Sequence, residues 1–289
     1  MNQHTVDLVR DDRGVLFDTQ GEVASTGWTT DDPYPRLLAL LDGAPVREGS
    51  LEALMGEPPQ FGRMFADRDA YTILSFEHVN QAFMDGENFS NEVYDTLTKN
   101  RLGDTLLNMD GARHTRMRDI AKPWFKPAFA AQWWNDNWIE QAVSELFDRF
   151  APRGEAELNL ELCAPLPMSV ISTGFGIARE DALPLRKAVH DVTAQHSPES
   201  VAAANAEIGR IMTRVIASRR ADPRDDLVSR MVQADLKLED GSTRKLADDE
   251  VMRFCLLIVF AGGGTTWRQL GITIKALLDR PDQLAALRA

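Results

Sequence analysis

The chain has 289 residues, 44% of them hydrophobic, which is enough apolar material for a substantial core. Its formal net charge of −12 argues against nucleic-acid binding and against attachment to an anionic membrane surface. Its 2 cysteines, Cys163 and Cys255, form no C-x-x-C pair, which argues against a disulfide framework and against a zinc site. The first residues contain no apolar segment typical of a signal peptide, so a cytoplasmic protein is expected.

The beginning of the chain is polar, and residues 1–33 are predicted to form an N-terminal arm on the surface. The remaining pattern predicts a single, mainly α domain with minor β structure over residues 34–289. It shows no internal repeat, no low-complexity segment and no linker.

The first part of this domain shows short periodic stretches separated by turn residues. Helices are predicted at residues 35–41 and 76–84. Residues 64–66 and 71–74 are predicted to pair as a small β-hairpin. Residues 88–108 predict a long loop, and its apolar side chains leave two interpretations open, a binding loop or plain packing.

Residues 110–122 predict a helix that is unusually basic for an acidic protein. His114 and Arg118 are four residues apart, so they share a face and form a suitable pair for carboxylates. Such a pair is also common on a solvated surface. The same alternatives, a solvated face or a dock for an anionic partner, apply to the surrounding cations Arg113, Arg116, Lys122 and Lys126.

The middle of the chain is predicted to be helical, apart from a short edge strand at residues 157–160 and a small hairpin around Asp240-Gly241. A helix ending near Phe150 carries a tryptophan stripe at residues 133–138, which is typical of core packing. Further helices are expected at residues 165–174, 179–195, 208–216 and 225–234.

The stretch FCLLIVFAGGGTTWRQLG, residues 254–271, is the part around which the rest of the chain is organised. An acidic start at residues 248–250 suits a helix N-terminus, and no proline follows until Pro281, so one helix of about 31 residues is predicted. Residues 254–261 are apolar on every side, which is typical of a buried helix. Gly262, Gly263 and Gly264 bare the backbone, which allows a packed helix or a flat ligand to approach closely.

Two motifs in this order resemble the cytochrome P450 family, specifically its soluble bacterial members. KLADDEVMRFCLLIVFAGGGTTWRQLG is similar to the family's long central helix with its A-G-x-[DE]-T-T motif. DGARHTRMRDIAKPWFKPAF is similar to the family's helix that carries H-x-x-x-R before an aromatic-proline turn. The implied fold is the N-terminal and central part of that mainly α architecture, with a minor β-sheet, from about residue 34 to the end.

The resemblance also implies a haem site and assigns residues to it. His114 and Arg118 would hold the haem propionates, and Ala261 and Gly262 would line the oxygen side of the haem. Thr265 would hydrogen-bond dioxygen there and help to deliver protons, and the loop at residues 88–108 would cover the substrate. The implied activity is that of a haem-thiolate monooxygenase, which inserts one oxygen atom from O2 into a small organic substrate. Its electron donor, a protein such as a ferredoxin, would dock on Arg113, Arg116, Lys122 and Lys126.

The sequence departs from the family pattern in two respects. Gly264 stands where the family usually has Asp or Glu to relay protons, so water or a polar substrate group is expected to substitute. The resemblance also implies a chain that stops before the E-x-x-R helix and the iron-ligating cysteine loop, making residues 34–289 an incomplete cytochrome P450 domain. Cys163 and Cys255 are predicted to be small buried hydrophobes. A second hypothesis is therefore a catalytically inactive fragment that at most binds haem or another ligand weakly.

Overall fold

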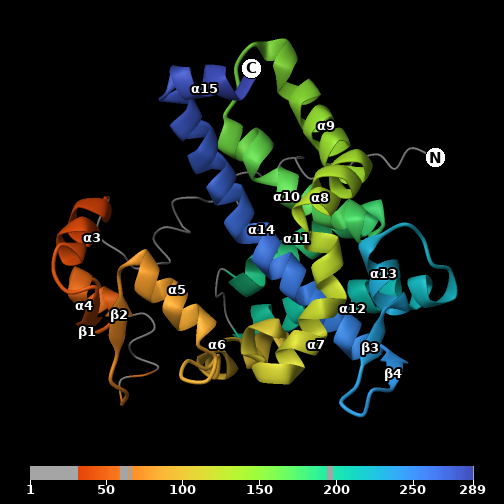
Figure 1. Cartoon of the computed structure of the whole chain (residues 1–289). Helices are drawn as coiled ribbons and strands as arrows, with labels where there is room; N and C mark the ends of the chain where they lie inside the picture. The colour runs from red at the N-terminus through yellow and green to blue at the C-terminus, as the bar shows by residue number, and fades with distance from the viewer. Residues whose placement is uncertain (1–31, 59–64, 66, 194–197, 289) are drawn as a thin grey trace. The chain divides into compact units, whose positions relative to one another are not determined.

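The computed structural model of the chain describes residues 32–58, 65, 67–193 and 198–288. The arm predicted for residues 1–33 lies outside these residues, apart from its last two. The described part is mainly α-helical (Figure 1), and it divides into two compact units, a smaller one that ends at Asn91 and a larger one that begins at Glu92. In the described part, no helix combines the length and apolar character needed to cross a bilayer.

Two short helices in the described part of the smaller unit start at serine caps. Ser50 Oγ accepts a hydrogen bond from the N–H of Ala53, and Ser75 Oγ accepts one from the N–H of His78. Such caps satisfy backbone donors that have no partner within the first turn of a helix. The capped helices are α4 (Leu51–Met55) and α5 (Phe76–Met84), and they follow α3 (Tyr34–Leu41), which starts after Pro33 without a side-chain cap. Of these helices, α3 and α5 were predicted.

The hairpin predicted in this unit is wrong in its pairing. Strand β2 (Tyr71–Ile73) pairs antiparallel with β1 (Val46–Glu48), which precedes α4. Of the expected partner at residues 64–66, only Phe65 is described, and it lies in a turn. Local alternation indicates a strand but carries no information about a partner that is distant in the sequence.

The larger unit is organised around α14 (Asp248–Leu278), the long helix predicted from the sequence. Its acidic first turn faces the positive end of the helix dipole, and the Glu250 carboxylate accepts the N–H of Ala247 at 2.8 Å. Figure 1 shows α14 as the long blue helix that crosses this unit and leads to α15 (Pro281–Arg288). It packs against α10 (Pro165–Gly174), α12 (Pro198–Ala221) and α13 (Leu227–Gln233), and α12 also packs against α11 (Arg179–Thr193).

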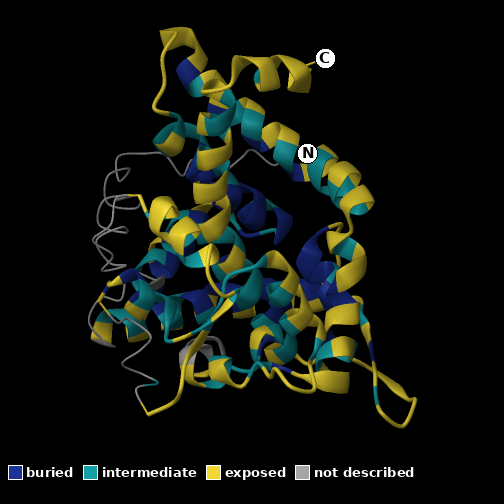
Figure 2. Cartoon of the chain, turned by 60° about the vertical axis from the view of Figure 1, so that its left-hand side comes forward, coloured by how far each residue is buried: buried dark blue, intermediate teal, exposed yellow. Residues whose placement is uncertain are grey.

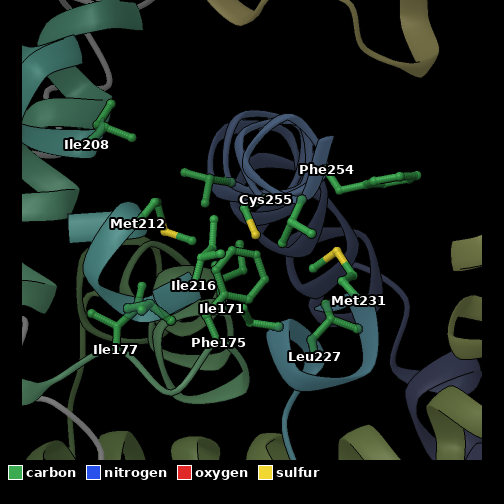
Figure 3. Packing of buried hydrophobic residues seen from close by; sticks show 14 of the residues in the cluster. Ile171, Phe175, Ile177, Ile208, Met212, Ile216, Leu227, Met231, Phe254 and Cys255 are labelled. Atoms are coloured by element: carbon green, nitrogen blue, oxygen red, sulfur yellow. The ribbon is translucent and has the colours of Figure 1, made fainter. Parts of the chain in front are cut away.

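The core of the larger unit lies where these helices meet (Figures 2 and 3). The spacing predicted for α12 directs Ile208, Met212 and Ile216 inward, and each is at most 1% exposed. Burial of one such side chain stabilises the fold by about 1.5–3 kcal/mol. Figure 3 shows Cys255 of α14 among these side chains, whereas the ring of Phe254 projects away from them. The face of α14 that carries Cys255 is therefore covered by other helices, whereas the face that carries Phe254 points away from this part of the core.

A buried ion pair connects the end of α12 to the start of α13 and to the turn between α10 and α11. Arg219 of α12 pairs with Asp226, and their side chains are only 4% and 7% exposed. Asp226 Oδ1 also accepts the N–H of Ser229 and so caps α13, close to the predicted helix start. Arg219 Nη2 donates to the carbonyl of Gly176 at 3.0 Å, in the turn between α10 and α11. One guanidinium thus fixes the positions of three helix ends.

The segment that carries Trp133, Trp134 and Trp138 forms a π-helix, which is wider than an α-helix. The helix η3 (Ala130–Ile139) has π-type hydrogen bonds, so residues five apart share a face. The rings of Trp133 and Trp138 consequently lie 4.4 Å apart, and Trp138 is 4% exposed, which confirms that the stripe is packing. The neighbouring elements are α7 (Gly111–Ala121), η2 (Lys122–Phe125), α8 (Pro127–Phe129), α9 (Glu140–Phe150) and η4 (Ala151–Arg153).

Two predictions for the larger unit are wrong. The expected loop at residues 88–108 contains helix α6 (Val93–Leu102) and the short helix η1 (Leu106–Asn108). Polar contacts hold α6 in place, including a 2.9 Å hydrogen bond from Asn108 to Asp95, and such contacts leave no apolar pattern in the sequence.

The expected strand at residues 157–160 is instead the start of the helical turn η5 (Asn159–Cys163). The Glu157 carboxylate accepts the N–H groups of Asn159 and Leu160, and this favours a helix start. The predicted hairpin around Asp240-Gly241 is confirmed as β3 (Asp235–Lys237) and β4 (Thr243–Lys245).

Candidate functional site

A cavity of about 770 Å³ lies between α14, α10 and the segment from α7 to η3. Its volume and its mainly apolar walls are typical of a site for a small organic ligand. The apolar walls consist of Leu106, Ala121, Phe125, Pro127, Trp134, Ile139, Leu166, Pro167, Val170, Ile171, Phe254, Leu257, Ile258, Ala261 and Leu270.

Cationic side chains line one edge of this cavity: Arg118, Lys122 and Lys126. Among the described residues, Arg118 forms no ion pair. Within the described part of the chain, Lys122 pairs with Asp119 at 3.9 Å, and both side chains are 61% exposed, so this pair contributes little. An apolar chamber with cations at one edge suits a ligand that is apolar over most of its surface and carries carboxylates at one end.

The α14 wall of the cavity follows a helical repeat. Ile258, Gly262, Thr266 and Leu270 all line it and are spaced four residues apart. The Thr265 side chain does not line the cavity, and its Oγ1 donates a hydrogen bond of 2.6 Å to the carbonyl of Ala261. Thr266 was not among the predicted site residues, although its spacing from Gly262 could have identified it.

The glycines of α14 have different surroundings. A Cβ at Gly262 would lie 3.1 Å from Ile171 Cδ1, and one at Gly263 would lie 3.0 Å from Met168 Sδ, both on α10. These two glycines therefore form a notch for helix packing, and Gly262 also lines the cavity. At Gly264 the nearest atom would be Arg268 Nη1 at 3.8 Å, which is an ordinary contact.

The structure therefore brings some of the predicted site residues together. Arg118, Ala261 and Gly262 line one cavity. His114 is half-buried on α7 and lies outside the lining, as does the side chain of Thr265. The hydroxyl of Thr265 nevertheless contacts the wall through Ala261.

No model of a protein family matches the chain. It is 31% identical over 276 residues to cytochrome P450 107B1 of Saccharopolyspora erythraea, a match that covers 90% of this chain and 66% of that protein. It is 32% identical over 198 residues to the cytochrome P450 monooxygenase PikC of Streptomyces venezuelae, covering 65% of this chain and 44% of that protein. The solved structure of the cytochrome P450 PksS of Bacillus subtilis matches with a TM-score of 0.70 at 25% identity, over 89% of this chain and 62% of that one.

This chain belongs to the cytochrome P450 family. The resemblance and the mainly α, cytochrome P450-like fold with minor β structure, both inferred from the sequence, are confirmed. The chain spans 44% to 66% of the length of these relatives.

The basic cluster of this cytochrome P450 chain divides into two parts. Lys122 and Lys126 line the large cavity. Arg113 pairs with Asp104 at 2.9 Å, and Arg116 pairs with Glu239 at 2.8 Å. The hydrogen bond from Arg113 holds the pKa of Asp104 below its usual range. The local sequence does not reveal these acids, because they come from elements outside α7.

The cysteines of the cytochrome P450 chain lie away from the cavity. Cys163 and Cys255 are both fully buried and do not line it, which confirms the prediction that they are small buried hydrophobes. Burial raises the pKa of both thiols, and the charge of Glu157 adds to the effect at Cys163. Within the described residues, His, Cys, Asp and Glu side chains form no group of three suited to a metal ion.

Proposed function

We propose that this chain supplies the oxygen-side wall of a haem monooxygenase site, which inserts one oxygen atom from O2 into a small organic substrate. The observation that carries the proposal is that Arg118 of α7 and Ala261 and Gly262 of α14 meet at one cavity of about 770 Å³. Membership of the cytochrome P450 family supports the same reaction class.

The cavity wall fits the organic part of haem. A flat macrocycle needs apolar walls, and Gly262 adds no side chain on the α14 side. Two carboxylates need cations, and Arg118 with Lys122 would hold them through charge-assisted hydrogen bonds. The described lining has no Cys, His, Met or Tyr, so it fits the porphyrin but does not supply an iron ligand. Haem, when bound, supplies reductive activation of O2, and a thiolate ligand favours cleavage of the O–O bond.

Thr265 and Thr266 are the hydroxyl groups proposed for proton delivery. Thr265 Oγ1 donates to Ala261 O, so its lone pairs remain available to accept a hydrogen bond from water. Thr266 lines the cavity and can hold a water molecule or a polar group of the substrate. Water is the proposed relay beside Gly264, because this residue offers no acid.

The electron donor is proposed to be an acidic protein such as a ferredoxin, docked on Arg113, Arg116, Lys122 and Lys126. The side chains of Arg113 and Lys122 are 54% and 61% exposed and are therefore accessible to a partner. Charge complementarity of this kind accelerates association and weakens with salt.

A second candidate function is ligand binding without catalysis. It is favoured by the lack of an iron ligand in the described lining of the cavity. In that case the chain would bind haem, or another amphiphilic ligand, without forming an oxygenated product.

Haem titration of the purified 289-residue chain tests these proposals. Haem binding is expected to quench the fluorescence of Trp134, which lines the cavity. Arg118→Gln should weaken binding about tenfold, as expected for a lost charge-assisted hydrogen bond. The matched control Arg153→Gln, whose partner is Glu161, should have no effect.

The haem complex is then supplied with an electron donor, small organic substrates and isotopically labelled O2. Product that contains the label supports the monooxygenase. Haem binding without product supports the second candidate. Failure to bind haem contradicts the monooxygenase, and it contradicts the second candidate as far as its ligand is haem.

A further inference from the structure

A second, smaller chamber of about 200 Å³ lies beside the large cavity in the same unit. Its apolar floor is formed by Met109, Met117, Leu236 and Leu238. Leu106, Phe254 and Leu257 line both chambers and form the wall between them.

Arginines from different elements surround this chamber. Those among the described residues are Arg113, Arg116, Arg244 and Arg253. Of the acids in the described part of the chain, Asp104 and Glu250 belong to the lining, so arginines outnumber acids there. Planar guanidinium groups above an apolar floor suit a carboxylate attached to a hydrocarbon.

The arginines differ in how firmly they are paired. Arg244 contacts both carboxylate oxygens of Glu250, at 2.6 and 2.7 Å, and the Glu250 side chain is only 16% exposed. Arg113 pairs at 2.9 Å with Asp104, which is 30% exposed. These partners are fixed in the chamber wall.

The partners of the other two arginines are exposed. Glu239 bonds Arg116 at 2.8 Å with a side chain that is 79% exposed. Asp249 bonds Arg253 at 2.7 Å with a side chain that is 61% exposed. Exposed pairs contribute about 0–1 kcal/mol, so an incoming anion can replace these two acids at little cost.

We propose that the smaller chamber is a binding site for a small organic monocarboxylate. The carboxylate replaces Glu239 at Arg116 and Asp249 at Arg253, and the hydrocarbon part lies on the methionine and leucine floor. The volume corresponds to about seven water molecules, so the ligand has on the order of ten non-hydrogen atoms, as octanoate has. The inference concerns a separate cavity and does not depend on haem binding.

Occupation of this chamber is coupled to the large cavity through the shared wall. A ligand in the smaller chamber would contact Phe254 and Leu257, which also line the large cavity. Any shift of these side chains changes the shape of the neighbouring cavity, so the two ligands affect each other's affinity reciprocally.

Calorimetric titration of the purified, haem-free chain with octanoate tests the proposal, with octanol as the neutral probe of similar size. Octanoate should bind at least tenfold more tightly than octanol. Arg116→Gln and Arg253→Gln should each weaken octanoate binding about tenfold, and Arg153→Gln should leave it unchanged. Glu239→Gln should strengthen it, because this change removes the acid that competes for Arg116.

The opposite effects of Arg116→Gln and Glu239→Gln separate ligand recognition from loss of a structural ion pair, which would act in the same direction for both. If Arg116→Gln and Arg253→Gln fail to fold, as judged by circular dichroism, two milder variants test the proposal. Glu239→Gln should still strengthen octanoate binding, and Arg116→Lys, which keeps the charge but loses the planar guanidinium, should weaken it. Equal binding of octanoate and octanol, no octanoate binding, or weaker binding by Glu239→Gln would overturn the proposal. Weakening by Arg118→Gln alone would overturn it as well, by assigning octanoate to the large cavity.

Discussion

The two sides of α14 serve different purposes although they share one apolar sequence. On one side, Cys255 and Val259 are completely buried against neighbouring helices. On the other, Phe254, Ile258 and Gly262 border open chambers. A helix that is apolar all round therefore need not be enclosed all round, because a ligand site requires apolar residues as much as a core does.

The test with the largest spectroscopic difference between its two outcomes asks whether Cys163 of η5 or Cys255 of α14 can ligate haem iron. Both cysteines are buried away from the cavity, with thiols whose pKa is raised, so neither should ligate haem iron as a thiolate. We expect no thiolate-type shift of the Soret band when the reduced, haem-loaded chain is exposed to carbon monoxide. Observation of that shift, and its loss in Cys163→Ala or Cys255→Ala, would contradict this assignment.

The next effect concerns the stability of the helical core that packs against the buried side of α14, and it is tested at the buried pair of Arg219 and Asp226. Arg219→Ala or Asp226→Ala leaves an unpaired buried charge, which should lower the free energy of unfolding by about 3–5 kcal/mol. Urea denaturation measures this change. The exposed pair Arg224–Asp222, whose side chains are 54% and 75% exposed, is the matched control, and Arg224→Ala should cost less than about 1 kcal/mol. Similar costs at both pairs would mean that the buried pair does not hold the helix ends.

A smaller effect compares two adjacent glycines, Gly263, which packs against α10, and Gly264, which does not. Gly264→Ala meets no close atom and should stabilise the helix by about 0.5–1 kcal/mol. Gly263→Ala would bring its Cβ to 3.0 Å from Met168 Sδ, so part or all of this gain should be lost as Met168 moves. Thermal unfolding of the two variants measures the difference. Equal gains would show that α10 does not need the notch.

The smallest effect is a pH dependence at the start of α14. The hydrogen bond from Arg244 is the main cause of the lowered pKa of Glu250. Because the folded pKa lies below the ordinary value of 4.5, the stabilisation is present above that pH and is lost as the pH falls through the folded pKa. We expect less than about 1 kcal/mol, because Arg244 is partly exposed. In Arg244→Gln the decline in stability below pH 4.5 should be shallower, and an unchanged profile would contradict the assignment.

The sequence predicted the features that depend on neighbouring residues. The length of α14 follows from an acidic start and a distant proline, and the inward face of α12 follows from the spacing of Ile208, Met212 and Ile216. The sequence did not predict α6, which is held by polar contacts such as Asn108 with Asp95.

For the site, the sequence identified three residues of the cavity wall, Arg118, Ala261 and Gly262. It did not identify the neighbours that come from distant segments. The pairing of Arg116 with Glu239 joins residues 123 positions apart, and no local pattern encodes it. The notch at Gly263 likewise depends on Met168 of α10.

The π-helix η3 predicts how aromatic residues should align between this chain and a relative that has an ordinary α-helix at this position. Because residues five apart share a face there, Trp133 and Trp138 lie together, whereas in an ordinary α-helix that spacing would turn them by about 140°. Deletion of one residue between them would place the tryptophans four apart and restore the common face within a regular helix. A relative with an α-helix at this position would therefore align its aromatic residues with this chain only across a one-residue gap.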